Sequence, residues 1–136
     1  MTTYMLTVDI DSNSGFCAGV IRAIGKAEEF LGKAKESGDN DRKLFSLGAI
    51  VHNDAELNRL MAQGLVTIDK EDLDEMVDAR GEVLLIRAHG EPPQTYEKAD
   101  SIGFEIIDCT CPVVLKLQQR IKEAYARHLE TGRGQI

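Results

Sequence analysis

The sequence predicts an α/β fold, built as a parallel sheet with helices on both faces. Apolar segments of strand length alternate with amphipathic segments of helix length along most of the 136 residues. The apolar run Val83–Ile86 is typical of a strand that is buried on both faces, as parallel strands are. This alternation predicts right-handed crossovers, with ligands bound beyond the carboxyl ends of the strands.

The individual elements follow from hydrophobic periodicity and from the turn residues between them. Segments rich in Val, Ile and Leu predict strands over residues 4–10, 44–47, 65–68, 82–87 and 104–108. The first of these alternates and precedes a polar turn at residues 11–15. Helices are predicted over residues 18–36, 54–63, 69–79, 94–102 and 113–130.

The predicted helices are bounded by residues that favour helix ends. Asp54 is expected to cap the second helix and Gly64 to end it. Gly103 is expected to end the fourth helix, and Gly132 the fifth. The third helix, over residues 69–79, is rich in acidic residues and has only a weak helical pattern. An apolar stripe marks the first helix at Val20, Ile24, Ala27, Leu31 and Ala34, and the last at Val114, Leu117, Ile121 and Ala124.

Composition narrows the class of protein. Lys and Arg total 16 and Asp and Glu total 23, so the net charge is −7. An acidic surface argues against binding to nucleic acid or to an anionic membrane. We expect no signal peptide, since the first ten residues contain Asp9 and lack a basic leader, and no apolar run reaches membrane-spanning length. Three cysteines without an export signal predict reduced thiols in the cytoplasm.

Two cysteines stand where a loop enters a predicted helix. Cys17 and Cys111 both occupy this position, where the helix dipole favours a thiolate. One such cysteine is more simply a packing residue, but an equivalent pair favours metal ligation. Zinc fits poorly because there is no Cys-x-x-Cys, whereas an iron–sulfur cluster accepts ligands distant in sequence. Cys109 points the same way as Cys111 in an extended segment, or is only a small residue beside the site.

Two histidines follow predicted strands. His52 and His89 are therefore expected at the same sheet edge as the cysteines. Singly, each is more simply a hydrogen-bonded structural histidine. As a pair they predict an anion site, because protonated imidazole binds phosphate oxygens. A phosphate loop at residues 19–26 is excluded by its spacing and by Ala27, which stands where Ser or Thr would bind magnesium.

Four motifs carry a resemblance to a known family. Residues 15–24 (GFCAGVIRAI), 48–53 (GAIVHN), 87–90 (RAHG) and 108–114 (DCTCPVV) resemble the motifs of the 4-hydroxy-3-methylbut-2-enyl diphosphate reductases, in that family's order. Each motif is weak alone, but the four together are specific. They cover nearly the whole chain.

The resemblance implies a fold of three similar α/β domains around a central cavity. Residues 1–110 are expected to be the first domain. Residues 111–136 are expected to be the helix leading into a truncated second domain, with Gln135 and Ile136 beginning a further strand. The cavity of the family holds a [4Fe-4S] cluster on three cysteines, of which Cys17 and Cys111 match two. His52 and His89 match two histidines that hold the substrate's diphosphate.

The resemblance also implies a reaction. The family removes the allylic hydroxyl of 4-hydroxy-3-methylbut-2-enyl diphosphate with two electrons from ferredoxin or flavodoxin, giving isopentenyl and dimethylallyl diphosphate. It has alanine where this chain has Cys109, so no ligand role passes to Cys109. The third cysteine, a third histidine and the acidic glutamate belong to later regions, so no catalytic residue is expected here and the chain is expected to be inactive alone.

Two other interpretations of the sequence stay open. One is a non-catalytic α/β module that binds an iron–sulfur cluster or a phosphate ligand. The other is a plain doubly wound domain in which the thiols are buried packing residues.

Overall fold

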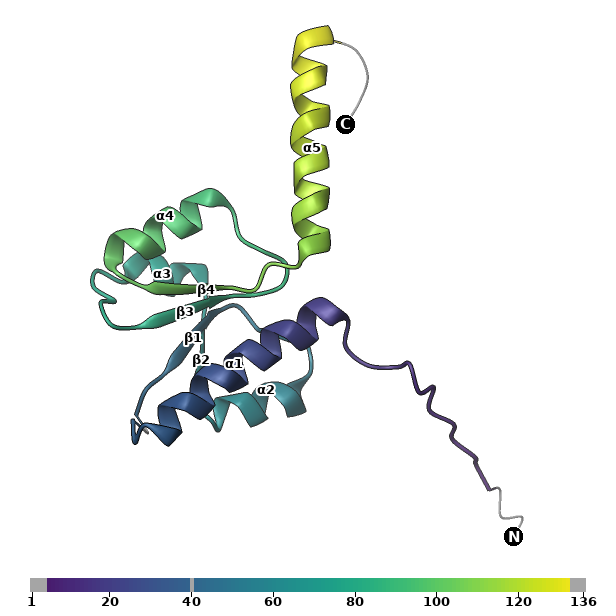
Figure 1. Ribbon diagram of the computed structural model, residues 1–136, viewed down its shortest axis with the longest axis vertical. Coiled ribbons are helices and arrows are strands. Elements are labelled where there is room, and N and C mark those ends of the chain that lie inside the picture. The colour runs from purple at the N-terminus through teal and green to yellow at the C-terminus, as the bar shows by residue number, and fades with distance from the viewer. Residues whose placement is uncertain (1–4, 40, 133–136) are drawn as a thin grey trace.

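Four parallel strands and five helices make up the described part of the chain, which is residues 5–39 and 41–132 of a computed structural model (Figure 1). The strands are β1 Leu44–Leu47, β2 Leu65–Ile68, β3 Val83–Ile86 and β4 Glu105–Asp108. The helices are α1 Ala18–Glu36, α2 Asp54–Met61, α3 Lys70–Glu75, α4 Pro93–Ile102 and α5 Pro112–Thr131. The predicted α/β class with a parallel sheet is confirmed.

The sheet has the strand order β2-β1-β3-β4, and every neighbouring pair is parallel. Leu44 of β1 is level with Leu65 of β2 on one side and with Val83 of β3 on the other. The chain proceeds outward in opposite directions from β1 and from β3, so the topological switch point lies between these two strands. Ligands of open α/β sheets bind beyond the carboxyl ends of the strands at such a point.

Helices cover both faces of the sheet, as predicted. Figure 1 shows α1 and α2 on one face and α3 and α4 on the other. Successive residues of β3 alternate between the two cores: Leu85 packs in the cluster under α1 and α2, and Leu84 in the cluster under α3 and α4. Both leucines are fully buried, which explains why the whole strand is apolar.

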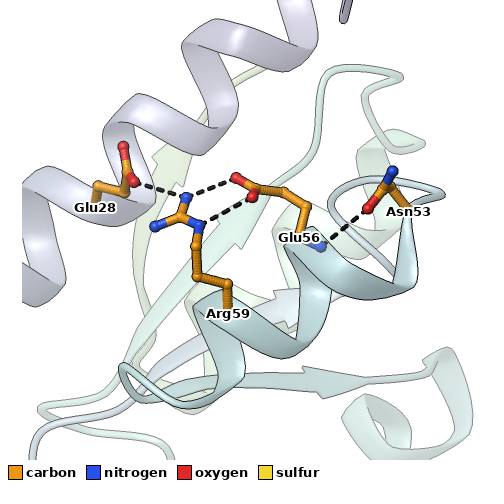
Figure 2. A network of polar contacts seen from close by, with 4 residues as sticks. All are labelled: Glu28, Asn53, Glu56 and Arg59. Atoms are coloured by element: carbon orange, nitrogen blue, oxygen red, sulfur yellow. Dashed lines mark hydrogen bonds and ion pairs between the residues drawn. The ribbon is translucent and has the colours of Figure 1, made fainter.

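A polar network joins α1 to α2 on the outside of the first face. Figure 2 shows Arg59 of α2 between Glu56, at 2.6 Å, and Glu28 of α1, at 2.7 Å. The hydrogen bond from Arg59 lowers the pKa of Glu56. These are surface ion pairs, so they align the two helices more than they stabilise them.

The second and third helices differ from the prediction at their ends. Asn53, not Asp54, is the N-cap of α2, and its side-chain oxygen accepts a hydrogen bond from the Glu56 amide at 3.0 Å (Figure 2). The helix itself ends at Met61 rather than at residue 63. In α3, Asp69 caps and the helix ends at Glu75, four residues early. The Ala79 amide instead donates to Ile102 at 2.7 Å, which holds residues 76–79 off the helix axis.

The predicted strand over residues 4–10 is wrong as far as the structure describes it. Residues 5–10 have no regular structure, and Tyr4 lies outside the described residues. The segment extends away from the body of the molecule, and Leu6 is 91% exposed (Figure 1). A strand needs a neighbour to satisfy its amide and carbonyl groups, and the described residues place none beside it.

The last helix stands apart from the sheet. Figure 1 shows α5 projecting from the end of β4, and none of its side chains is buried within the described chain. The predicted stripe is present, but Leu117 and Ile121 are about half exposed. Gly132 ends the helix with a positive φ of 62°, as predicted. Gln135 and Ile136 lie outside the described residues.

No helix within residues 5–39 and 41–132 combines the length and the apolarity that crossing a bilayer requires.

Candidate functional site

The carboxyl edge of the sheet gathers the motif-bearing loops. The loops after β1, β3 and β4 leave the sheet at this edge because all four strands are parallel. The first turn of α1 also reaches it, since a side chain added at Gly19 would stand 3.6 Å from Ala88, which follows β3. The first, third and fourth motifs therefore lie close together, at the start of α1 and in the loops after β3 and β4 (Figure 1).

Cys111 sits directly on the first turn of α1. It is the N-cap of α5, with an extended backbone, and its amide donates to the Ala88 carbonyl at 2.9 Å. A Cβ atom on Gly19 would stand only 3.1 Å from both the Cβ and the Sγ of Cys111. A glycine at position 19 is thus what allows the thiol to approach the helix so closely.

Cys17 begins the helix on which Cys111 rests. It is the N-cap of α1, and its carbonyl accepts the first helical hydrogen bond, from Ile21 at 3.0 Å. Its side chain is exposed and makes no capping hydrogen bond, so the thiol is available to a ligand. Gly19 is only two positions after Cys17, so the structure brings the starts of the two cysteine-bearing helices together.

Cys109 faces the interior instead. Its side chain is fully buried in the cluster that contains Ala23 and Ala27 of α1. Burial raises the pKa of this thiol, which disfavours the thiolate that binds a metal. Of the two interpretations left open by the sequence, the structure supports the small residue beside the site.

The loop that carries Cys111 is held by its own polar side chains. The Asp108 carboxylate accepts hydrogen bonds from the amide of Thr110, at 2.9 Å, and from its hydroxyl. Tyr96 of α4 donates to the same carboxylate at 3.2 Å. Burial raises the pKa of Tyr96, so the phenol stays protonated and keeps this bond. Nothing in the sequence pointed to this triad beyond the position of Asp108 in the fourth motif.

His52 and His89 flank the switch point of the sheet. His52 follows β1 and His89 follows β3, the two central strands, and both side chains are exposed. His89 lines a groove of about 900 Å³ between the loop after β3, α4 and the start of α5. His52 and Cys17 lie outside that groove, so the groove does not unite the candidate residues.

Arg87 adds a positive charge at the switch point. Its Nη1 atom lies 2.6 Å from where a Cβ on Gly48 would stand, and Gly48 has a positive φ of 72°. Its Nε atom is buried without a hydrogen bond among the described residues and is 3.7 Å from Glu91. From the sequence, alternation predicts that Arg87 points to the face opposite His89, so it was not included among the site residues, although it begins the third motif.

The thiols alone do not complete a metal site. Within residues 5–39 and 41–132, no three or more His, Cys, Asp or Glu side chains are grouped to hold a metal ion. The described residues therefore provide two candidate metal ligands, Cys17 and Cys111, without a third one grouped beside them.

Comparison with known proteins identifies the family. The family model of the LytB protein matches residues 8–131. The chain belongs to the LytB family. Among its LytB relatives, the 4-hydroxy-3-methylbut-2-enyl diphosphate reductase of Bacteroides thetaiotaomicron is 49% identical over 123 residues, covering 90% of this chain and 39% of that protein. The reductase of Chloroherpeton thalassium is 50% identical over 122 residues, covering 90% of this chain and 36% of that protein.

Solved LytB structures share the fold. The E-1-hydroxy-2-methyl-but-2-enyl-4-diphosphate reductase of Plasmodium falciparum matches with a TM-score of 0.69 and 33% identity, over 86% of this chain and 34% of that one. An (E)-4-hydroxy-3-methyl-but-2-enyl diphosphate reductase, named as the terminal enzyme of the non-mevalonate pathway, matches with a TM-score of 0.68 and 33% identity, over 90% and 40%. The family predicted from four motifs is confirmed. The chain spans about two fifths or less of the length of each relative.

Proposed function

We propose that this chain supplies two cluster ligands and part of a diphosphate site to a 4-hydroxy-3-methylbut-2-enyl diphosphate reductase. The observation that carries the proposal is the seating of Cys111 on the helix turn that Cys17 begins, in a chain half identical to reductases of that name. Residues 1–110 are the first α/β domain, and residues 111–136 lead into a second.

The residues present fit part of an iron–sulfur site. Clusters are held by thiolates that can be distant in sequence, and Cys17 and Cys111 both stand at helix N-termini, which favour thiolates. The bare Cα of Gly19 leaves room beside Cys111. A third ligand comes from outside the described residues. When bound, a [4Fe-4S] cluster with three thiolates supplies electrons and an iron that acts as a Lewis acid.

The protein side chains hold and orient the substrate. His52 and His89, on the two sides of the switch point, donate hydrogen bonds to diphosphate oxygens. Arg87, whose guanidinium lies against Gly48, adds positive charge at the same edge of the sheet. The anchored diphosphate directs the allylic hydroxyl toward the thiol-bearing starts of the two helices. Holding the substrate in this orientation lowers the entropic cost of the reaction.

The overall reaction is a reductive dehydroxylation. Two electrons and two protons are consumed, the allylic hydroxyl leaves as water, and isopentenyl or dimethylallyl diphosphate is formed. Ferredoxin or flavodoxin supplies the electrons. The three free thiols suit a reducing compartment, and we place the enzyme in the cytoplasm. The acid that protonates the substrate lies outside this chain, so the chain alone has no turnover.

A chimaera tests the proposal in an enzyme of full length. Residues 8–131 replace the matching segment of the Bacteroides thetaiotaomicron reductase, which is 49% identical. The chimaera is expected to form both products. Cys17→Ser and Cys111→Ser are expected to abolish activity, and His52→Ala to raise KM by about tenfold through one lost charged hydrogen bond. An active Cys17→Ser or Cys111→Ser chimaera contradicts the proposal.

A non-catalytic module is the second candidate. The exposed side chains of His52 and His89, which follow the two central strands, support it, because they could bind a phosphate ligand without a cluster. Such a module would still bind inorganic diphosphate in a His52-dependent manner. It would not restore turnover in the chimaera, and this outcome separates the two functions.

A further inference from the structure

The register between α1 and the loop before α5 depends on one helix face. Positions 19, 22 and 23 lie on the same side of α1, because residues three and four apart are neighbours on a helix. Gly19 contacts Cys111, and Ala23 shares a buried cluster with Cys109. Between them, the Nη2 atom of Arg22 donates to the Thr110 carbonyl at 2.9 Å. Three neighbouring helix positions thus face three consecutive loop residues.

The backbone hydrogen bonds of this loop run to β3 and not to α1. The Cys109 amide donates to Ile86 at 2.8 Å, and the Cys111 amide donates to Ala88 at 2.9 Å. These bonds continue the pairing of β4 with β3, so they fix the loop relative to the sheet. No backbone hydrogen bond of the described residues joins the start of α1 to this loop, so side chains alone connect the two. The bond from Arg22 to Thr110, which joins residues 88 apart, crosses that boundary.

The chemistry of this contact suits a positioning role. A guanidinium that donates to a carbonyl makes a charge-assisted hydrogen bond, which is stronger than a neutral one. The carbonyl belongs to the residue immediately before Cys111, so movement of α1 is resisted beside the thiol itself.

We propose that Arg22 is a positioning residue, which holds the Cys17-bearing start of α1 in register with Cys111 so that the two thiolates reach one metal centre. The part of this inference that concerns the centre rests on the proposed function. The register is a property of the chain and is tested without any metal. Arg22 lies within the first motif, five residues after Cys17.

Thiol crosslinking measures the register directly. The metal-free chain carrying Cys109→Ala is treated with a short dithiol-specific reagent, ethanediyl bismethanethiosulfonate. Formation of the intramolecular Cys17–Cys111 bridge is followed by peptide mass spectrometry. Arg22→Met keeps most of the side-chain length and removes the donors, so bridge formation is expected to slow roughly fivefold. Arg22→Lys, which keeps the charge and one donor group, is expected to recover part of the rate.

Lys26→Met is the matched control. Lys26 lies one turn further along the same face of α1, is exposed, and pairs with Glu29 at 3.2 Å. It removes the same charge without touching the loop, so the parental rate is expected. Circular dichroism establishes that each variant is folded. If Arg22→Met does not fold, Arg22→Lys replaces it in the comparison. Its rate of Cys17–Cys111 bridge formation is then expected to lie between the rate of the parent and that of an unfolded control.

The inference is overturned by parental bridging in folded Arg22→Met, by equal slowing in Lys26→Met, or by no bridge in the parent. Anaerobic incubation with iron and sulfide then separates it from the proposed function. Bridging that depends on Arg22 in a chimaera that takes up no cluster supports the register and contradicts the metal centre. Cluster uptake that is reduced in Arg22→Met, and recovered in Arg22→Lys, supports both.

Discussion

Single atoms decide how close the two cysteine-bearing helices come. Cys109 is fully buried beside α1, whereas Cys111 lies against Gly19 at the first turn of that helix and is only partly buried. The sequence identified the three cysteines and ranked two as ligands. It did not distinguish the environment of Cys109, because alternation along an extended segment shows which way a side chain points and not how deeply it is buried, here beside Ala23 and Ala27.

Gly19→Ala and Gly25→Ala provide a matched pair on the same helix. A Cβ at Gly25 meets nothing within 4 Å, so Gly25→Ala is expected to raise the free energy of unfolding by about 1 kcal/mol through helix propensity alone. A Cβ at Gly19 would stand 3.1 Å from Cys111, so Gly19→Ala is expected to cause overpacking that costs about 1 kcal/mol or more. This cost cancels or exceeds the gain in helix propensity. Urea unfolding measures both. Equal stabilisation by the two substitutions contradicts the close contact.

The buried Cys109 thiol predicts a pH dependence of stability. Its pKa is raised by burial, so above about pH 9, its ordinary value, the unfolded chain loses this proton before the folded chain does. The folded state then binds more protons, and the free energy of unfolding falls as the pH rises. The parent is therefore expected to keep its stability advantage over Cys109→Ala below about pH 9 and to lose it progressively as the pH rises further. Urea titrations with parallel pH profiles would contradict this burial.

At the scale of elements, local capping explains where the helices begin. Asn53 was missed as the cap of α2 because Asp54 is an equally good cap residue by type, and only backbone geometry separates neighbours. The extended φ of −146° at Asn53 places its side chain over the Glu56 amide. The strand expected at residues 4–10 failed for a different reason. Its pattern is correct for a strand, but pairing needs a second strand, which a local pattern does not contain.

Asn53→Ala and Asp54→Ala test the cap of α2. Loss of the side-chain acceptor in Asn53→Ala is expected to lower the free energy of unfolding by about 1 kcal/mol. Asp54→Ala is expected to change it by less than about 0.5 kcal/mol, because Asp54 is exposed in the first turn and does not cap. Chemical denaturation of the two variants decides between them. A larger loss in Asp54→Ala would restore the cap predicted from sequence.

At the scale of the whole molecule, the sheet and the four helices that cover it form one packed unit. The last helix, α5, projects from this unit and does not pack on the sheet. Both hydrophobic clusters lie between the sheet and α1–α4. The alternation of strands and helices, the parallel sheet and the common edge of the motif loops were all predictable, because periodicity and parallel topology determine them. The isolation of α5 was not, since an amphipathic stripe predicts that a helix is covered without indicating what covers it.

Limited proteolysis tests this division. An isolated helix of this length is marginal in water, and α5 carries four exposed tryptic sites with no buried side chain. Trypsin is expected to remove α5 first and leave a resistant fragment that ends near Lys116. Mass spectrometry of the early products shows the order of cleavage. Cleavage within α1 or α4 at the same rate would contradict a separate sheet unit.

Cadmium titration of the chain carrying Cys109→Ala tests most directly whether Cys17 and Cys111 share one centre. Cadmium is a soft ion that binds thiolates, and its sulfur charge-transfer absorption reports each bond formed. The account predicts one tight ion per chain, and Cys17→Ser and Cys111→Ser each lose nearly all of the tight binding. Half the absorption at unchanged affinity in either variant would show two separate thiols and contradict the shared site.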